Sequence, residues 1–183
     1  MTLLRRVRDY AAHPDPLTAA CNRVALLVAS NQPFYPLYLW WIVGGDWQVA
    51  CWTFLSTPFF AAVPAMARRN ALAGRAMLPL TGIANGILSA KAFGAPSGVE
   101  LFLIPCGLIA CLAFRSSGRR IGAVLLAVTA LAGLLHGHYG APLGHFDASD
   151  YAHFRRLNAI SVAMLSAMIV WSLSRARSSS VPR

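Results

Sequence analysis

The sequence predicts an all-α membrane protein: a polytopic bundle of six transmembrane helices with both termini in the cytoplasm. The 183 residues are 57% hydrophobic and only 12% charged, whereas soluble domains carry about 25% charged residues. Six apolar runs are each long enough to cross a hydrocarbon core of about 30 Å as a helix. Strands are not expected, because period-two alternation is absent. Lipid must therefore cover much of the surface.

The chain divides into a basic arm at residues 1–16, a six-helix domain at 17–174 and a disordered tail at 175–183. Within the arm, LLRRVRDYA predicts an amphipathic helix on the inner membrane surface, ended by Pro14 and Pro16. The arm lacks the apolar stretch and cleavage site of a signal peptide. The tail is basic and rich in serine, which is typical of disorder.

The apolar runs are expected at about 17–43, 47–66, 76–93, 99–114, 121–135 and 157–173. Pro33 and Pro36 interrupt the first run and predict a kink in its helix. Gly44–Asp46 predicts a tight turn before the second run. The small residues Gly82 and Gly86, four apart in the third run, predict close packing against another helix.

Positive charge indicates the orientation. Of the 16 Lys and Arg residues, twelve fall on one side if the N-terminus is cytoplasmic, and three fall on the other, with Arg23 near the inner end of its helix. An excess of Lys and Arg marks the cytoplasmic side of a membrane. The twelve are Arg5, Arg6, Arg8, Arg68, Arg69, Arg75, Arg115, Arg119, Arg120, Arg175, Arg177 and Arg183; the three are Lys91, Arg155 and Arg156.

The polar stretch SNQPFYP, residues 30–36, is the first candidate site. Amide side chains inside a bilayer are costly unless they are paired, so they usually face the bundle interior. Hydrogen bonding between helices around the kink would explain them. The alternative is a ligand pocket in which amides orient a polar head and aromatic rings hold an apolar body. The residues of that pocket would be Asn31, Gln32, Tyr35, Tyr38 and Asn85.

Glu100 is the second candidate, because it enters an apolar run directly after a Gly/Pro/Ser turn. Lys91 is expected at the same outer level of a neighbouring helix, so an interfacial ion pair is one interpretation. A role in ligand binding or gating from the outer side is the other. A single acid does not establish a proton path.

Histidines gather in the loop between the last two runs. Imidazole and carboxylate groups together can bind Zn, Cu or Ni, and histidine also titrates near neutral pH. A solvated loop without either role is the third interpretation. The candidate metal ligands are His136, His138, His145 and His153, with Asp147 and Asp150 beside them.

Other classes find little support. The sequence carries no nucleophile elbow, P-loop or HExxH motif, so we expect no enzyme, and no particular cofactor is indicated. Nucleic acid is not expected as a partner, because the arginines lie at the ends of apolar runs. Cys21, Cys51, Cys106 and Cys111 lie in or near apolar runs and form no CxxC pair, so we expect buried thiols.

Three stretches resemble the six-helix membrane sensor domains at the N-termini of bacterial histidine kinases and class III adenylate cyclases. RDYAAHPDP with NQPFYPLYLWW resembles the first helix of quorum-sensing receptor kinases of the CqsS kind. LPLTGIANGILSAKAFGAPSGVELFLIPCGLIACLAFR is similar to their third and fourth helices, and RRLNAISVAMLSAMIVWSL to their last. The resemblance implies a multi-pass protein of the bacterial inner membrane.

The resemblance also implies a function. We expect a sensory or regulatory module that binds a small, partly lipophilic ligand and signals through its sixth helix. The chain ends about ten residues after that helix, so the output is expected to reach a separate signalling partner, unless the chain is a fragment or a stand-alone relative. A homo-oligomer, a small transporter or metal-handling protein, and a structural subunit of a membrane complex are the alternatives.

Overall fold

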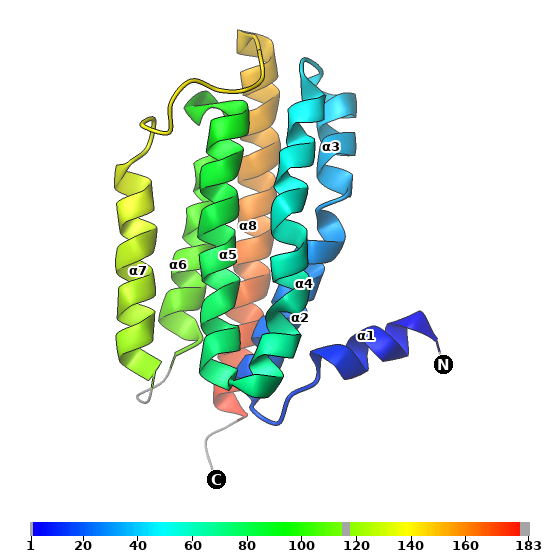
Figure 1. Ribbon diagram of the computed structural model, residues 1–183, viewed down its shortest axis with the longest axis vertical. Helices are drawn as coiled ribbons and strands as arrows, with labels where there is room; N and C mark the ends of the chain where they lie inside the picture. The colour runs from blue at the N-terminus through cyan, green and yellow to red at the C-terminus, as the bar shows by residue number, and fades with distance from the viewer. Residues whose placement is uncertain (1, 115–117, 180–183) are drawn as a thin grey trace.

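The computed structural model describes residues 2–114 and 118–179, and all regular structure in those ranges is helical (Figure 1). The all-α prediction is confirmed. The elements are α1 (Leu3–Ala11), α2 (Pro16–Asn31), α3 (Phe34–Tyr38), the π-helix η1 (Leu39–Val43), the 3-10 helix η2 (Trp47–Ser56), α4 (Thr57–Arg69), α5 (Ala71–Phe93), the 3-10 turns η3 (Ala95–Ser97) and η4 (Val99–Phe102), α6 (Leu103–Leu112), α7 (Arg119–Leu134) and α8 (Ala148–Ser178).

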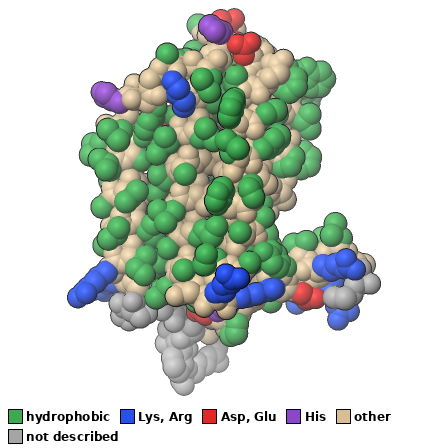
Figure 2. Space-filling view, viewed as in Figure 1, with side chains coloured by type: hydrophobic (Ala, Val, Ile, Leu, Met, Phe, Trp, Pro, Cys, Tyr) green, Lys and Arg blue, Asp and Glu red, His purple; other side chains and the backbone are tan. Residues whose placement is uncertain are grey.

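The long helices stand side by side in a bundle, and the chain runs up and down between its two ends (Figure 1). Helix α1 and the C-terminal end of α8 lie at the lower end, where arginines from α4, α5, α7 and α8 gather; we call it the basic end. The opposite end carries the histidine-rich loop before α8, and we call it the histidine end. Figure 2 shows most Lys and Arg side chains at the lower end; histidine and acidic side chains lie at the upper end, and further acidic side chains lie at the lower end. Helix α1 leaves the basic end sideways.

The first apolar run is broken as Pro33 and Pro36 predict. Helix α2 ends at Asn31, and α3 begins at Phe34. The segment then widens into a π-turn, in which the Gly44 amide donates to the Leu39 carbonyl over 2.8 Å. Gly44 and Gly45 have φ of 84° and 56°, which other residues adopt only at a cost. The predicted turn at Gly44–Asp46 is therefore confirmed.

Within the described ranges, three helical segments are long and apolar enough to cross a membrane: Trp47–Arg69, Ala71–Phe93 and Ala148–Ser178. The segments Phe34–Val43 and Val99–Leu112 are apolar but shorter. Large apolar side chains cover the outside of the bundle (Figure 2), and Trp41 and Leu134 are 81% and 80% exposed. Such a surface requires lipid rather than water as its surroundings.

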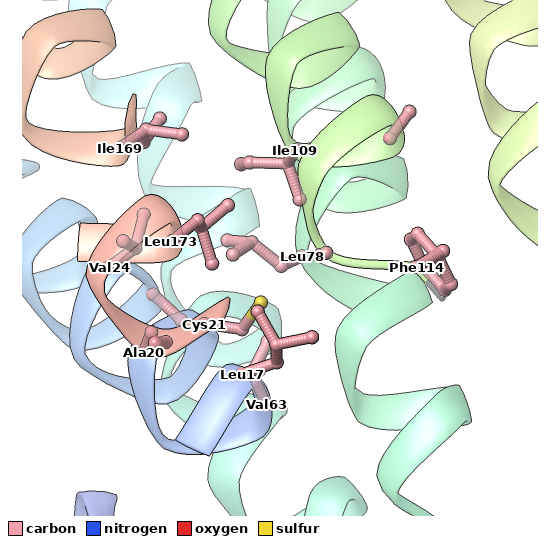
Figure 3. Close-up of a cluster of buried hydrophobic side chains, with 14 of the residues drawn as sticks. Leu17, Ala20, Cys21, Val24, Val63, Leu78, Ile109, Phe114, Ile169 and Leu173 are labelled. Atoms are coloured by element: carbon pink, nitrogen blue, oxygen red, sulfur yellow. The ribbon is translucent and has the colours of Figure 1, made fainter. Parts of the chain in front are cut away.

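Two large apolar clusters and a smaller one around Ile83, Cys106 and Ala132 fill the bundle. The cluster near the basic end brings together α2, α4, α5, α6 and α8, with Leu17, Cys21, Leu78, Ile109 and Leu173 among its buried residues (Figure 3). The cluster near the histidine end is aromatic. It includes Phe93 and Phe154, which are fully buried, with ring centroids 5.3 Å apart. Helices α5 and α8 contribute to both large clusters and so connect the two ends.

Small residues set the closest helix contacts. A Cβ at Gly82 would lie 2.6 Å from the Cys106 Sγ of α6, whereas one at Gly86 would meet Leu103 at an ordinary 3.8 Å. The predicted close approach of this stretch is confirmed at Gly82. Gly74 is tighter still, because an added Cβ would lie 2.5 Å from the Ala67 Cβ of α4.

The last helix is longer at both ends than predicted. A capping box formed by Asp147 and Asp150 starts α8 at Ala148, nine residues before the expected position at 157. The helix continues to Ser178, so the expectation of a disordered tail from residue 175 is wrong for residues 175–178. Arg177 is held there by hydrogen bonds to α6. Residues 180–183 and Arg115 lie outside the described residues.

Candidate functional site

The break after α2 buries one amide of the predicted pocket. Gln32 is 6% exposed, and its Nε2 donates to Ser56 Oγ of η2 over 2.7 Å. Ser56 Oγ in turn lies 2.9 Å from Asn85 Oδ1 of α5 and 2.8 Å from the Thr53 carbonyl. The hydroxyl has one proton and donates to one of these acceptors at a time. Gln32, Ser56 and Asn85 therefore form a polar chain across three segments.

A second chain leads from the break to the last helix. Tyr35 Oη of α3 donates to Asn158 Oδ1 of α8 over 3.0 Å, and Asn158 Nδ2 donates to the Ser97 carbonyl of η3 over 3.0 Å. Asn158 and Ser97 are fully buried. The Tyr35 ring also packs on Phe93, with centroids 5.8 Å apart. The kink thus contacts both the aromatic cluster and α8.

Asn31 and Tyr38 do not join these chains. Both are exposed on the outside of the bundle, and the Tyr38 ring stacks on Phe34 with centroids 6.5 Å apart. An open apolar depression lies on the surface of η2 and α4, but none of the predicted ligand-binding residues lines it. Its lining residues are Cys51, Trp52, Phe54, Leu55, Pro58 and Phe59.

Glu100 is mostly buried at the histidine end, with 10% of its side chain exposed. Its partner is His136, whose Nδ1 pairs with Oε2; the expected partner Lys91 instead donates to the Ala141 carbonyl over 2.7 Å. The ion pair predicted between Glu100 and Lys91 is therefore absent from the structure. The loop after α7 contacts Glu100 through His136. No pattern in the sequence predicts that contact.

The remaining histidines have separate surroundings. His138 Nδ1 lies 2.9 Å from the His136 carbonyl, and His153 is exposed on α8. His145 donates to Asp46 Oδ2 from its backbone amide over 2.9 Å, and its ring Nδ1 lies 3.3 Å from the same oxygen. These bonds hold the pKa of Asp46 below its ordinary value. Among the described residues, no three His, Cys, Asp or Glu side chains form a group that could hold a metal ion.

Comparison with known proteins gives one match. The family model of MASE7 domains, which are membrane-associated sensor domains, covers residues 8–178.

The chain belongs to the MASE7 family.

No curated protein and no solved structure matches it. Family membership makes this chain a membrane sensor domain, in agreement with its apolar outer surface.

The basic end of this MASE7 domain holds a set of contacts that the sequence did not reveal. Arg177 of α8 donates to the carbonyls of Cys111 and Leu112 over 3.0 and 2.8 Å, and Arg75 of α5 donates to the Ala113 carbonyl over 2.8 Å. The last carbonyls of α6 lack partners within their own helix. Two arginines from neighbouring helices satisfy them: Arg177 fastens the end of α8 to α6, and Arg75 fastens α5 to α6.

Ser56, Asn158 and Arg177 are the residues of this MASE7 domain that sequence reasoning missed. Each is a polar residue inside or beside an apolar run. That position was the available signal, because such residues usually face the bundle interior. Their partners lie 24, 61 and 65 residues away along the chain, so no local pattern could name them.

Proposed function

We propose that this MASE7 domain binds a small, partly lipophilic ligand at the break between α2 and α3 and signals through α8 to a separate protein. In this proposal it is a multi-pass protein of the bacterial inner membrane with six spans, both termini are cytoplasmic, and no catalytic step or cofactor takes part. The observation that carries the proposal is the bond between Tyr35 and Asn158, which ties the break directly to α8.

The break supplies groups that suit a polar head. The amides of Gln32 and Asn85 meet at the Ser56 hydroxyl, and a ligand carbonyl or hydroxyl could replace one of these partners. Pro33 and Pro36 have no backbone N–H, so the helix cannot close across this point. A joint of that kind can change its angle with little loss of hydrogen bonding. Phe34 and Tyr38, exposed beside it, would contact the apolar part of the ligand.

Helix α8 is the candidate output element. It packs into the aromatic cluster through Phe154 and into the cluster at the basic end through Ile169 and Leu173. A displacement at Asn158 would therefore reach the basic end through one rigid helix. A ligand shifts such an equilibrium only by binding one of the two states more tightly.

The test uses purified protein in lipid nanodiscs and a panel of straight-chain amphiphiles. Each carries one hydroxyl or carbonyl group and an alkyl chain of roughly four to twelve carbons, sizes a bundle pocket can bury. A binding amphiphile should raise the Tm and alter hydrogen exchange along α8. Gln32→Leu should abolish the Tm shift, whereas Gln48→Leu, on an exposed position of η2, should keep it.

Tyr35→Phe separates binding from output. It removes the hydroxyl that reaches Asn158 but keeps the ring on Phe93. We expect the Tm shift to persist and the exchange change in α8 to disappear. An equal Tm shift in wild type and Gln32→Leu would reject the binding site, and an unchanged α8 response in Tyr35→Phe would reject the route.

Affinity purification from native membranes in mild detergent, followed by mass spectrometry, addresses the partner. A kinase or cyclase recovered in near-stoichiometric amount is the expected result. Recovery of the protein alone would contradict signalling to a separate partner.

A further inference from the structure

Helix α1 presents an apolar stripe that nothing in the described chain covers. Leu3, Leu4 and Val7 are 76%, 82% and 45% exposed. At 100° per residue these three side chains share one face of the helix, and Arg5 falls opposite. In Figure 2, hydrophobic side chains lie along the upper edge of the projecting helix, toward the level of the apolar bundle surface, with charged side chains below.

The helix is fixed to the bundle at its C-terminal end. Tyr10 Oη donates to the Ala61 carbonyl over 2.9 Å, and Asn22 Nδ2 donates to the Ala11 carbonyl over 3.1 Å. Arg68 donates to the Tyr10 carbonyl over 3.2 Å and lies 5.0 Å from the centre of the Tyr10 ring. These contacts hold α1 across the bundle axis at the level of the basic end, where Figure 1 shows it projecting sideways.

The charges of α1 indicate what covers its apolar stripe. Its nine residues carry Arg5, Arg6 and Arg8 against one acid, Asp9. A helix with a wide apolar face and arginines beside it binds at the boundary of headgroups and acyl chains, and prefers anionic lipids. The apolar surface of the bundle extends down to the level of α1 (Figure 2).

We propose that α1 is an anionic-phospholipid-binding helix, with Leu3, Leu4 and Val7 in the acyl boundary and Arg5, Arg6 and Arg8 on lipid phosphates. The contacts of Tyr10, Asn22 and Arg68 then set the depth and rotation of the whole bundle in the membrane. This role is independent of the ligand site proposed above.

The test places an environment-sensitive fluorophore on a cysteine that replaces Leu4 or Asp9, in the full chain with Cys21, Cys51, Cys106 and Cys111 changed to Ser. The protein is reconstituted in vesicles of phosphatidylcholine alone or with one-quarter phosphatidylglycerol. At position 4 we expect blue-shifted emission and quenching by spin labels on the acyl chains, both stronger with phosphatidylglycerol. At position 9 we expect emission typical of water.

Charge variants test the anionic preference. The double substitution Arg5→Gln/Arg6→Gln should weaken the effect of phosphatidylglycerol on the fluorophore at position 4 about tenfold or more. The control is Arg119→Gln/Arg120→Gln, because these arginines are also exposed at the basic end; it should preserve the effect. Native mass spectrometry of the unlabelled proteins should show the same loss of bound phosphatidylglycerol. Water-like emission at position 4 in both vesicles would overturn the proposal. So would shielding that appears only at high protein-to-lipid ratio, since a second copy would then cover α1.

Discussion

At the residue scale, several long-range polar contacts in this protein satisfy the open carbonyls at helix ends. Asn22 of α2 caps α1, and Arg75 of α5 and Arg177 of α8 cap α6. The last carbonyls of a helix have no partner within that helix, and here a neighbouring helix supplies the donor. Each cap therefore also joins two helices.

Removing one cap should loosen two helices together. Arg177→Ala leaves carbonyls at the end of α6 without that donor and frees the last turn of α8 from α6. We expect faster hydrogen exchange in the last turns of both helices. Arg175→Ala is the matched control, because Arg175 lies over the Trp171 ring of its own helix, 5.7 Å from the centroid. Equal effects of the two substitutions would contradict a capping role.

A double-mutant cycle tests the interaction between Glu100 and His136. His136→Ala leaves a carboxylate that is mostly buried without its partner, at a cost of about 1–3 kcal/mol. The value is lower than for a fully buried pair, because the His136 side chain is 62% exposed. Glu100→Gln should restore most of the Tm lost in His136→Ala. Additive losses in the double variant would show that the two groups do not interact.

Asp15 is expected to make the stability of the fold sensitive to acid. Partial burial raises its pKa, but hydrogen bonds from the Thr18 hydroxyl and amide and the nearby Arg75 outweigh that effect, so the pKa lies below the ordinary 3.8. A lowered folded-state pKa contributes stability that is present above pH 3.8 and is lost as the pH falls through the folded value. Asp15→Ala, which removes the cap of α2, should lower Tm near neutral pH and flatten its decline in acid. An unchanged acid profile would exclude Asp15 as the group responsible.

At the scale of elements, glycines decide how closely the helices pack. Gly74 of α5 lies against the backbone of α4 at Ala67, while Gly86, on the same helix, has room for a methyl group. Helix association in a membrane depends on such close contact. The sequence pattern predicted the stretch from Gly82 to Gly86 but gave no sign that Gly74 is tighter.

These two glycines give a matched prediction. Gly74→Ala forces α4 and α5 apart and should cost about 1–3 kcal/mol, the usual range for overpacking. Gly86→Ala makes the same change on the same helix and should leave stability close to wild type. The Tm of each variant is measured by thermal unfolding in detergent, with size-exclusion chromatography as the readout. Similar Tm values for the two variants would show that the contact at Ala67 is not limiting.

At the scale of the whole molecule, charge and apolar surface separate along the bundle. Arginines gather at the basic end, which holds α1 and the end of α8, and the middle is apolar (Figure 2). Every second loop between the apolar runs also carries an excess of Lys and Arg. Both features favour an orientation with the basic end in the cytoplasm.

Thiol labelling tests this orientation. Cysteines replacing Ser149 and Asn70, in a background without other cysteines, sit at the histidine end and at the turn between α4 and α5. In intact cells a membrane-impermeant maleimide should label position 149 and spare position 70 until the cells are lysed. Labelling of position 70 in intact cells would reverse the orientation.

The sequence by itself determined the helical class, the approximate helix positions, the kink and the membrane setting of this protein. Each follows from local composition, such as an apolar run, a proline or an arginine at a run end, and needs no knowledge of distant neighbours. It also indicated polar residues that turn inward, among them Gln32, Tyr35 and Asn85. The tertiary structure alone decided their partners, Ser56 and Asn158, and paired Glu100 with His136 rather than Lys91. These contacts depend on how the helices rotate and pack against one another, and packing is set by the whole set of side chains rather than by any one stretch.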